Sequence, residues 1–566
     1  MPGVTLPFLP IIYVRGYAMW MKDIIETTST PYMGFNDGAT KIRRGPDREV
    51  QKLFFESPLV RLMKDYGYTD MYRDGHELPD ALSPRCVVIC RYYDPADPDF
   101  GGQPRPTIEA GASCLAALIL RVRELTCDTR DERERFRVYL VAHSMGGLIC
   151  RKLLQNPAGS DEETAKSLVR RVFTYATPHG GIESRDFPLF GSLGAHLTRF
   201  SPLNIAKTMG LRNRNGPVNT LNKKWIPEEF FCLVGTNYKD YPSRVRLIIG
   251  DGSDGLVRVK NAWMPECPHA MVHRSHSGPH GIVNSEEGYR HLVRFLFGSA
   301  TVKGLLSIRN LPSGNRGGAT FVDLLGGPAG DRGRSGLPSG NRGGATFDVE
   351  VTVTENDGVA ISERTARLWS ELPADADPRN GATTANKPFM KVPIFSLYLP
   401  NPPIVSEPSR SALVPSLCFT VEIAVVVRGR VLQGKMHAPD VFREPVYRGS
   451  FMVHVWQDDN RELGARLMGL DGKWASNFRR EAQTVGREFG APGLKSDVPL
   501  NSEKGFSGTL HLRITPRDDD IAPSPPAPAV GGGTSGMDIE SGLATGALDT
   551  GMLNDQQITE SEGTES

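Results

Sequence analysis

The chain falls into two parts with different hydrophobic periodicity. In roughly the first 300 residues, short unbroken apolar runs alternate with segments whose apolar positions recur every three or four residues. The runs are typical of strands buried on both faces, and the second pattern predicts amphipathic helices. Their alternation predicts an α/β class with a mostly parallel sheet and helices on both faces. Strands are expected at 8–14, 86–92, 136–142, 169–176 and 230–235, and helices at about 104–125, after residue 144 and at 285–297.

From residue 347 the period changes to two. Apolar and polar residues alternate at 347–354, and the alternation returns at 417–427, 451–455 and 510–514. This pattern is typical of strands with one buried face. Several such strands with few helical segments predict an all-β, sandwich-like domain over about 347–515.

Three other stretches complete the domain plan. Residues 20–80 mix short apolar runs with Gly and Pro, which predicts an insertion outside the core. Residues 299–346 are rich in Gly, Ser and Arg, and an 11-residue segment at 311–321 recurs unchanged at 337–347. Two copies indicate a local duplication in a linker rather than a solenoid. Residues 516–566 hold one Arg and ten acidic residues, which predicts a disordered acidic tail.

Composition narrows the choice of partners. The chain has 66 Lys and Arg and 65 Asp and Glu, so its net charge of +1 creates no bulk field toward nucleic acid or an anionic membrane. The repeated Asn-Arg-Gly-Gly segments lack interleaved aromatic residues, so no nucleic-acid partner is expected. The oligomeric state stays open.

The eight cysteines are scattered, mostly in apolar runs, and form no metal-type pair of pairs. Buried free thiols favour a reducing compartment. No apolar run reaches the roughly 18 residues of a transmembrane helix. The N-terminus lacks a basic region followed by an apolar core, so no cleaved secretory signal is expected. A cytoplasmic location and export by a signal-peptide-independent route both stay open.

One stretch carries a candidate nucleophile. The apolar run that ends at Ala142 is followed by His143-Ser144-Met145-Gly146-Gly147 and then by a helical pattern. A serine at such a tight turn has a strained backbone and an exposed hydroxyl, and the residues two before and two after it must be small. Ala142 and Gly146 meet this condition. The N-terminus of the next helix directs free N–H groups and a positive dipole end toward the serine.

The motif AHSMGG, with a strand before it and a helix after it, resembles the nucleophile elbow of the α/β-hydrolase lipases and esterases. The similarity is greatest to bacterial lipases and to GPI-inositol-deacylase-like esterases, and it covers about residues 8–298. It implies an α/β-hydrolase fold with residues 1–298 as the catalytic domain. It also implies hydrolysis of carboxylic esters, with lipids among the substrates, through an acyl-serine intermediate and without a metal or organic cofactor.

A serine hydroxyl needs a base within hydrogen-bond reach and an acid that orients the base. The resemblance implies the chain order Ser, Asp, His. Asp254, in the sequence Asp-Gly-Leu-Val, best matches the acid of the family, and Asp251 and then Asp240 are the alternatives.

The base is expected within residues 268–283, which hold four histidines in twelve residues. The family places its base in a loop before a short apolar step, a serine and the last helix, and His280 fits that description. His276 is the alternative, and His273 reads as part of a strand. Close histidines also suggest zinc, but the intervening Pro and Gly break any helix and no carboxylate pair accompanies them, so no metal site is expected.

The resemblance also implies roles around the serine. Arg15-Gly16-Tyr17 stands in the place of the family's His-Gly oxyanion turn, with Arg15 where His is usual. The implied oxyanion donors are the backbone N–H groups of Tyr17 and Met145. Arg15 either pairs with an acid at the rim of the core or meets a substrate anion.

His143 and His179 are candidates for the substrate pocket. His179 belongs to the turn at 177–181, which lipase relatives share, and it is expected to be a turn or pocket-rim residue rather than a catalytic one. Residues 182–228 stand where these relatives keep a cap or lid, and a fixed structural insertion is the alternative.

Other functions stay open at this point. The same three residues would serve an amidase or a thioesterase. The hydrolase part could also be an inactive interaction module, with the β-rich part carrying the function. That β-rich part either makes a peripheral contact with a membrane or partner or simply covers the hydrolase part. Fold alone does not decide among these.

Overall fold

The computed structural model describes residues 7–18, 21–44, 50–73, 76–77, 81–182, 198–212, 216–239, 252–278, 280–311, 346–367, 390–401, 415–431, 440–458, 460–469, 475–477, 479–480 and 493–517. Contacts divide the chain into a large unit, Met1–Pro525, and a second unit, Pro526–Ser566. The expected acidic tail from residue 518 onward and the linker residues 312–345 lie outside the described residues.

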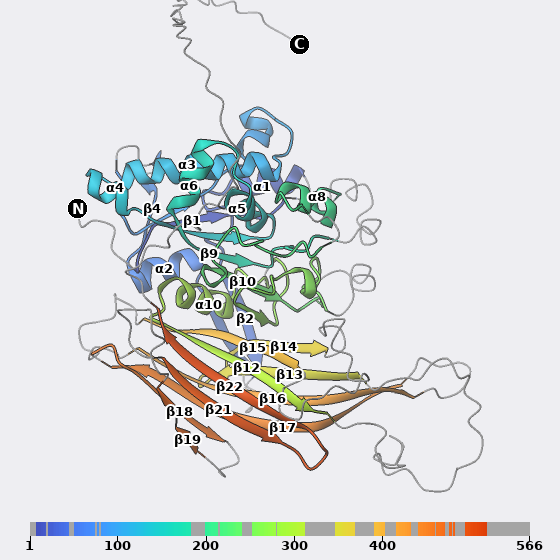
Figure 1. Cartoon of the computed structure of the whole chain (residues 1–566). Coiled ribbons are helices and arrows are strands. Elements are labelled where there is room, and N and C mark those ends of the chain that lie inside the picture. The colour runs from blue at the N-terminus through green and yellow to red at the C-terminus, as the bar shows by residue number, and fades with distance from the viewer. Residues whose placement is uncertain are drawn as a thin grey trace, which may run out of the picture. The chain divides into compact units, whose positions relative to one another are not determined.

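Seven parallel strands form the sheet of the first part (Figure 1). Their order is β11-β10-β9-β8-β1-β7-β4, so β8, which leads into the candidate nucleophile, is the middle strand. The five strands expected from the apolar runs are confirmed. The bounds are β1 (Ile11–Val14), β4 (Thr69–Asp70), β7 (Cys86–Ile89), β8 (Val138–His143), β9 (Val169–Tyr175), β10 (Phe230–Gly235) and β11 (His269–Val272).

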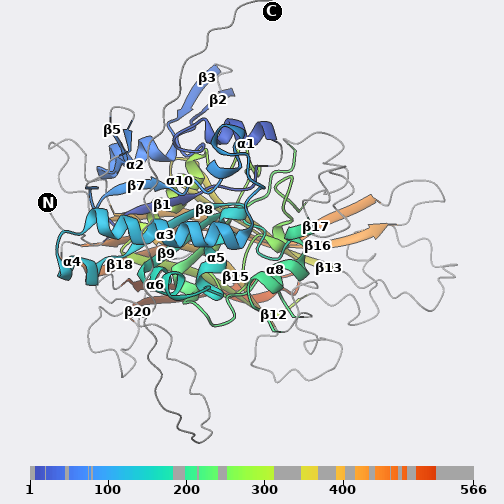
Figure 2. The same cartoon turned by 90° about the horizontal axis from the view of Figure 1, so that it is seen from above.

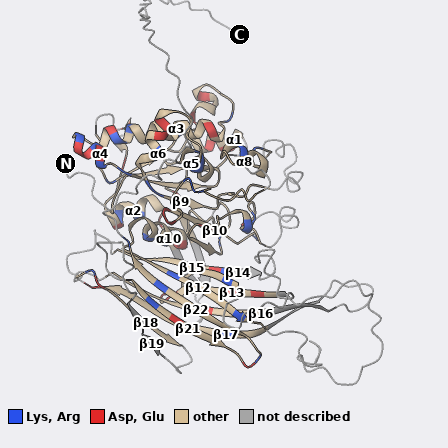
Figure 3. Ribbon diagram, viewed as in Figure 1, with Lys and Arg blue, Asp and Glu red and all other residues tan. Residues whose placement is uncertain are grey.

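Helices cover both faces of this sheet. Helices α3, α5 and α6 lie on one face and α10 on the other, and Figure 2 shows α3 lying across the sheet beside α5 and α6. Charges of both signs are interspersed along α4 (Figure 3). Among the described residues, no helix has both the length and the apolar character needed to cross a membrane. The bounds are α1 (Met21–Thr28), α2 (Pro58–Tyr66), α3 (Ile108–Thr126), α4 (Arg130–Arg135), α5 (Met145–Gln155), α6 (Ser160–Leu168), α8 (Pro202–Thr208) and α10 (Glu286–Phe297), and the 3₁₀ turns are η1 (Asp94–Ala96), η2 (Pro98–Phe100), η4 (Thr198–Phe200), η5 (Pro227–Glu229) and η6 (Val259–Asn261).

Two helix starts follow from side chains that cap them. Ser285 accepts a hydrogen bond from the N–H of Gly288, which confirms it as the N-cap of α10. Thr107 caps α3 in the same way, so this helix begins at Ile108 and not at the prolines before it. A parallel sheet in this strand order, covered by helices on both faces, is an α/β-hydrolase fold, which confirms the expected fold class.

Residues 20–80 contribute more to the core than the sequence analysis predicted. Helix α2 buries Leu59, Leu62 and Tyr66, and β4 extends the parallel sheet at its edge. Apolar residues spaced by three and four positions gave this signal, but the surrounding Gly and Pro concealed it. The rest of the stretch holds α1 and two small hairpins, β2 (Ala39–Arg44) with β3 (Val50–Phe55) and β5 (Tyr72–Arg73) with β6 (His76–Glu77).

Two antiparallel sheets form the second part, which confirms the expected β-rich domain. One has the order β15-β12-β22-β21-β20 and the other β14-β13-β16-β17-β18-β19. Their inward residues form one shared hydrophobic core. The bounds are β12 (Ala300–Asn310), β13 (Thr346–Glu355), β14 (Ala360–Arg367), β15 (Met390–Leu399), β16 (Ser416–Val431), β17 (Asp440–Gln457), β18 (Leu463–Gly469), β19 (Ala475–Asn477), β20 (Arg479–Arg480), β21 (Leu494–Asn501) and β22 (Ser507–Pro516).

Strand β12 corrects the predicted linker at 299–346. It pairs with β15 on one side and with β22 on the other, so the β-rich part begins at Ala300 rather than at 347. Ala300 and Val302, and later Leu306 and Ile308, are buried. These buried positions alternate without a break along β12, because the extra residue of the bulge opposite Gly304 and Leu305 is Ile394 of β15. The Gly-, Ser- and Arg-rich composition of the stretch that follows hid the strand in the sequence.

The two parts meet through α10 and β11. Arg290 and Arg294 of α10 both form ion pairs with Glu355 at the end of β13. The Nε2–H of His291 donates a hydrogen bond of 2.6 Å to the carbonyl of Ile361 in β14. A carbonyl can only accept, so the hydrogen bond fixes the proton on Nε2.

His291 makes the stability of this contact dependent on pH. Burial lowers its pKa to about 4, below the value of about 6.5 of an exposed histidine. Between these two values the unfolded chain binds a proton that the folded chain excludes, so the free energy of unfolding falls as the pH drops from about 6.5 to about 4. In His291→Gln we expect this loss to be smaller by up to about 3 kcal/mol. Urea unfolding of the wild type and the variant at several pH values between about 4 and 6.5 measures this difference, and His273→Gln, which changes an exposed histidine, is the control. An equal dependence of the unfolding free energy on pH in all three proteins would contradict the prediction.

Candidate active site

Ser144 occupies the tight turn between β8 and α5. Its φ of 52° and ψ of −120° are unusual for a residue with a side chain, and they confirm the strained turn predicted from the sequence. The N–H of Ser144 donates to the carbonyl of Tyr175 over 2.9 Å, and the carbonyl of Ser144 accepts from the N–H of Gly147 over 3.1 Å. Hydrogen bonds to the backbone of β9 and α5 therefore keep Ser144 in this strained conformation.

Three glycines permit the close packing around this turn. A Cβ atom on Gly146 would lie 2.1 Å from the carbonyl oxygen of Val14, and one on Gly16 would lie 2.7 Å from the Cβ of Ser144. A Cβ on Gly147 would lie 2.1 Å from Oγ1 of Thr177. The elbow, the turn after β1 and the turn after β9 are therefore in van der Waals contact only because these positions lack side chains.

The parallel sheet brings further polar residues to the same edge. Ser144 follows β8, Asp254 lies in the segment between β10 and β11, and His276 follows β11. All these strands run the same way, so their carboxyl ends meet at one edge of the sheet, where α/β proteins place their sites. Residues 132 positions apart in the chain thus come into hydrogen-bond contact.

His276 lies between the serine and the acid. Its Nε2 is 3.0 Å from Oγ of Ser144, and its Nδ1 is 2.8 Å from Oδ2 of Asp254. The exposed fractions are 7% for Ser144, 4% for His276 and 1% for Asp254. An ionised carboxylate only accepts, so Nδ1 carries the proton and Nε2 accepts from the serine hydroxyl.

The preference for His280 is corrected here in favour of His276. The side chain of His280 is exposed, and its carbonyl accepts from the N–H of Ser275. Ser275 also pairs with Gly281. The side chain of His276 is buried against Ser144 and Asp254, whereas that of His280 is exposed. The sequence could not reveal this because both histidines precede the same apolar step and last helix.

Asp254 is fixed by its own loop. Its Oδ1 accepts from the N–H groups of Leu256 and Val257 over 3.0 and 2.7 Å, which leaves Oδ2 for His276. The N–H of His276 also donates to the carbonyl of Asp254 over 3.0 Å. Asp254 and His276 are therefore aligned by backbone as well as by side chains. The alternatives Asp251 and Asp240 lie outside the described residues.

His143 is held against the backbone of His276. Its Nε2–H donates to the carbonyl of His276 over 2.9 Å. Desolvation lowers the pKa of His143 well below its usual range, and the neighbouring His276 lowers it further. A neutral His143 can donate to this carbonyl without placing a second charge beside the base.

His179 is a buried residue of the turn at 177–181, which agrees with the first of the two expectations for it and not with a position at a pocket rim. Its side chain has no solvent exposure, and its Nε2 lies 3.2 Å from Oγ1 of Thr174. Its carbonyl accepts a hydrogen bond of 2.8 Å from buried Arg151. Desolvation lowers the pKa of His179, which keeps the ring neutral in the interior. Contacts of His179 with buried residues thus fix the turn at 177–181.

The two backbone donors named by the resemblance lie on either side of the serine. Gly16 touches Ser144 and precedes Tyr17, and Met145 is the first residue of α5. Within the described ranges, neither N–H group donates to an acceptor of the protein. The Nη1 of Arg15 donates to the carbonyl of Met33. Burial raises the pKa of Asp37, and the nearby charge of Arg15 opposes this shift.

Part of the segment at 182–228 packs beside this turn. The rings of Phe200, in η4, and Tyr17 meet edge to face with centroids 5.3 Å apart. Helix α8 follows, and Leu203 at its start has an exposed fraction of 64%. Residues 183–197 and 213–215 of the expected cap lie outside the described residues. The part of the chain that the structure describes contains no group of three or more metal-ligating side chains.

No protein-family model matches the chain, and no curated protein matches it. Among solved structures, it is similar to the mature form of the Bacillus licheniformis lipase BlEst2 at 15% sequence identity, covering 49% of this chain and 87% of that one. The TM-score of this match is 0.26, a likeness too distant to support a conclusion about activity. The fold assignment accordingly depends on strand order and helix placement.

The close contact at Gly147 gives a prediction for stability. We expect Gly147→Ala to lower the free energy of unfolding by about 1–3 kcal/mol because the new methyl group overlaps Thr177. Thr177→Ala alone should cost less, since its buried hydroxyl has no hydrogen-bond partner. The double variant should recover part of the loss because Oγ1 and Cγ2 are gone. Urea unfolding of the wild type, the two single variants and the double variant measures this coupling. Strictly additive changes in the free energy of unfolding would contradict the predicted overlap.

Proposed function

We propose that this protein is a serine hydrolase that cleaves carboxylic esters through an acyl-serine intermediate. One observation carries the proposal: an unbroken hydrogen-bonded series from Ser144 through His276 to Asp254, with distances of 3.0 and 2.8 Å. An isolated serine hydroxyl is a weak nucleophile at neutral pH. A base at this distance, oriented by a buried carboxylate, provides what the hydroxyl lacks.

The proposed reaction uses each residue in turn. Ser144 attacks the ester carbonyl while His276 takes its proton, and Asp254 keeps His276 in the required tautomer and stabilises the imidazolium. The N–H groups of Tyr17 and Met145 bind the oxyanion, each contributing about 3 kcal/mol to the transition state. The imidazolium then protonates the leaving alcohol. A water molecule, activated by the same imidazole, releases the acid from the serine.

We further propose acyl lipids as the substrates. Exposed apolar side chains stand in segments that follow strands at the sheet edge carrying Ser144. Phe100, after β7, has an exposed fraction of 68%, and Leu203, after β9, one of 64%. Such side chains suit acyl chains or a peripheral contact with a lipid surface. Phe200 and Tyr17 provide aromatic surface next to the proposed oxyanion donor.

The direct test is hydrolysis of p-nitrophenyl esters of short and long acyl chains, with matched amide and thioester substrates alongside. We expect ester turnover that increases with chain length and a fall in kcat of about 10⁴-fold or more in Ser144→Ala. A wild type that cleaves no ester, even with detergent present, would contradict the proposal. Preference for the amide or thioester would replace the ester assignment while keeping the nucleophile.

The two histidines give a sharper prediction. His276→Ala should lower kcat by about 10⁴-fold or more, because Ser144 then has no base. His280→Ala is the matched control and should keep near wild-type kcat, since its side chain is exposed. Thermal midpoints of both variants separate catalytic loss from unfolding. The reverse pattern would show that the loop rearranges in the active enzyme and would restore His280 as the base.

A further inference from the structure

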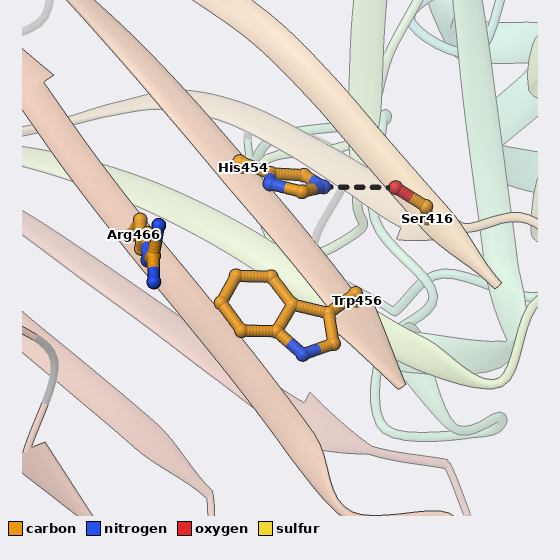
Figure 4. A pocket seen from close by; sticks show the side chains of 4 residues that line it. All are labelled: Ser416, His454, Trp456 and Arg466. Atoms are coloured by element: carbon orange, nitrogen blue, oxygen red, sulfur yellow. Dashed lines mark hydrogen bonds between the residues drawn. The ribbon is translucent and has the colours of Figure 1, made fainter. Parts of the chain in front are cut away.

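A second polar site lies on the outer face of the β-rich part, apart from Ser144, His276 and Asp254. Leu417, Val453, Val455 and Leu467 of β16, β17 and β18 point into the hydrophobic core. Side chains alternate along a strand, so the positions between them lie on the opposite face. A pocket of about 360 Å³ opens on that face (Figure 4). It is lined by Ser416, His454, Trp456 and Arg466.

The indole of Trp456 packs on a glycine of the neighbouring strand. Trp456 in β17 stands opposite Gly464 in β18. A Cβ atom on Gly464 would lie 2.2 Å from Cε2 of the indole and within 2.5 Å of two further ring atoms. The ring therefore covers the glycine backbone closely, and a larger residue there would displace it. The strand holds the indole against the sheet at the pocket.

Cationic and neutral polar groups surround the indole. The guanidinium of Arg466 lies 6.0 Å from the ring centroid, and no ion pair joins Arg466 to a carboxylate among the described residues. The imidazole of His454 lies 4.9 Å from the indole by ring centroids, and its Nε2 is 2.9 Å from Oγ of Ser416. Figure 4 shows the four side chains grouped on adjacent strands. Among the described residues, those that line the pocket include no acidic side chain.

These groups define the chemistry of a ligand. The negative face of an aromatic ring attracts C–H groups, so a flat saccharide ring can stack on the indole. Arginine is suited to planar anions because its N–H groups match the two oxygens of a carboxylate. Ser416 and His454 offer a donor and an acceptor to hydroxyl groups. The volume is near the lower end of the range for small-molecule sites, about 300–1,000 Å³.

We propose that this pocket binds a saccharide that carries a carboxylate, such as a uronic acid residue of a glycan. The sugar ring stacks on Trp456, its carboxylate pairs with Arg466, and its hydroxyls contact Ser416 and His454. Charge complementarity favours this occupant over a neutral sugar, because the described residues that line the pocket include the cation of Arg466 and no acid. The pocket shares no residue with Ser144, His276 and Asp254. Binding of a glycan there is therefore independent of the reaction at the serine.

The test is binding of glucuronate and of short oligogalacturonates to the full chain, followed by calorimetry, with glucose as the neutral ligand and acetate as the bare carboxylate. We expect uronates to bind at least tenfold more tightly than either. Trp456→Ala and Arg466→Gln should each weaken uronate binding at least tenfold. Arg448→Gln, which changes an exposed arginine of β17 outside the pocket, is the matched control and should bind as wild type does.

Gly464→Ala provides a second variant that keeps both ligand-contacting side chains. It should weaken uronate binding by displacing the indole, and far-ultraviolet circular dichroism verifies that the sheet remains folded. Equal affinity for glucose and uronate would overturn the proposal, as would uronate binding that survives both Trp456→Ala and Arg466→Gln. Equal affinity for acetate would overturn it by showing that the indole takes no part. Ester hydrolysis by these variants should be unchanged, so failure of the pocket and failure of the hydrolase proposal remain distinguishable.

Discussion

The strained backbone of Ser144 is the constraint on which the account of this structure depends. A residue with a side chain holds a φ of 52° only where its surroundings fix it. Here the fixing groups are backbone atoms of β1 and β9 and the close approach allowed by Gly16 and Gly146. The same packing turns the hydroxyl toward His276. Strain, packing and the alignment of the proposed nucleophile are therefore one feature of the fold.

The loop that carries His276 is supported from both parts of the large unit. It leaves β11 and leads into α10, and both elements contact the β-rich part. His291 and two arginines of α10 bind strand β14 and Glu355. The β-rich part thus contacts the elements on either side of His276. The saccharide pocket is an additional proposal and lies on a different face.

The sequence predicted the parts of this structure that depend on local pattern. Apolar runs and helical spacing revealed the sheet, and the small residues around Ser144 revealed the elbow. The sequence could not decide between His276 and His280, because the choice depends on which of the two side chains packs against Ser144 and Asp254. It also missed β12, whose alternation is intact but which leads into a Gly-, Ser- and Arg-rich stretch. It left open whether His179 is a turn residue or a pocket-rim residue, and the ring is buried. The choice between the histidines and the burial of His179 depend on three-dimensional contacts that periodicity does not encode.

The most direct test of the central claim is to locate the serine that reacts with a fluorophosphonate. The account predicts a single covalent adduct, mapped by peptide mass spectrometry to Ser144, that forms much more slowly in His276→Ala and at the usual rate in His280→Ala. A fluorophosphonate reacts readily with a serine only when that serine is activated and accessible. Labelling at another residue, or equal labelling of Ser144 in wild type and His276→Ala, would contradict the proposed series of Ser144, His276 and Asp254.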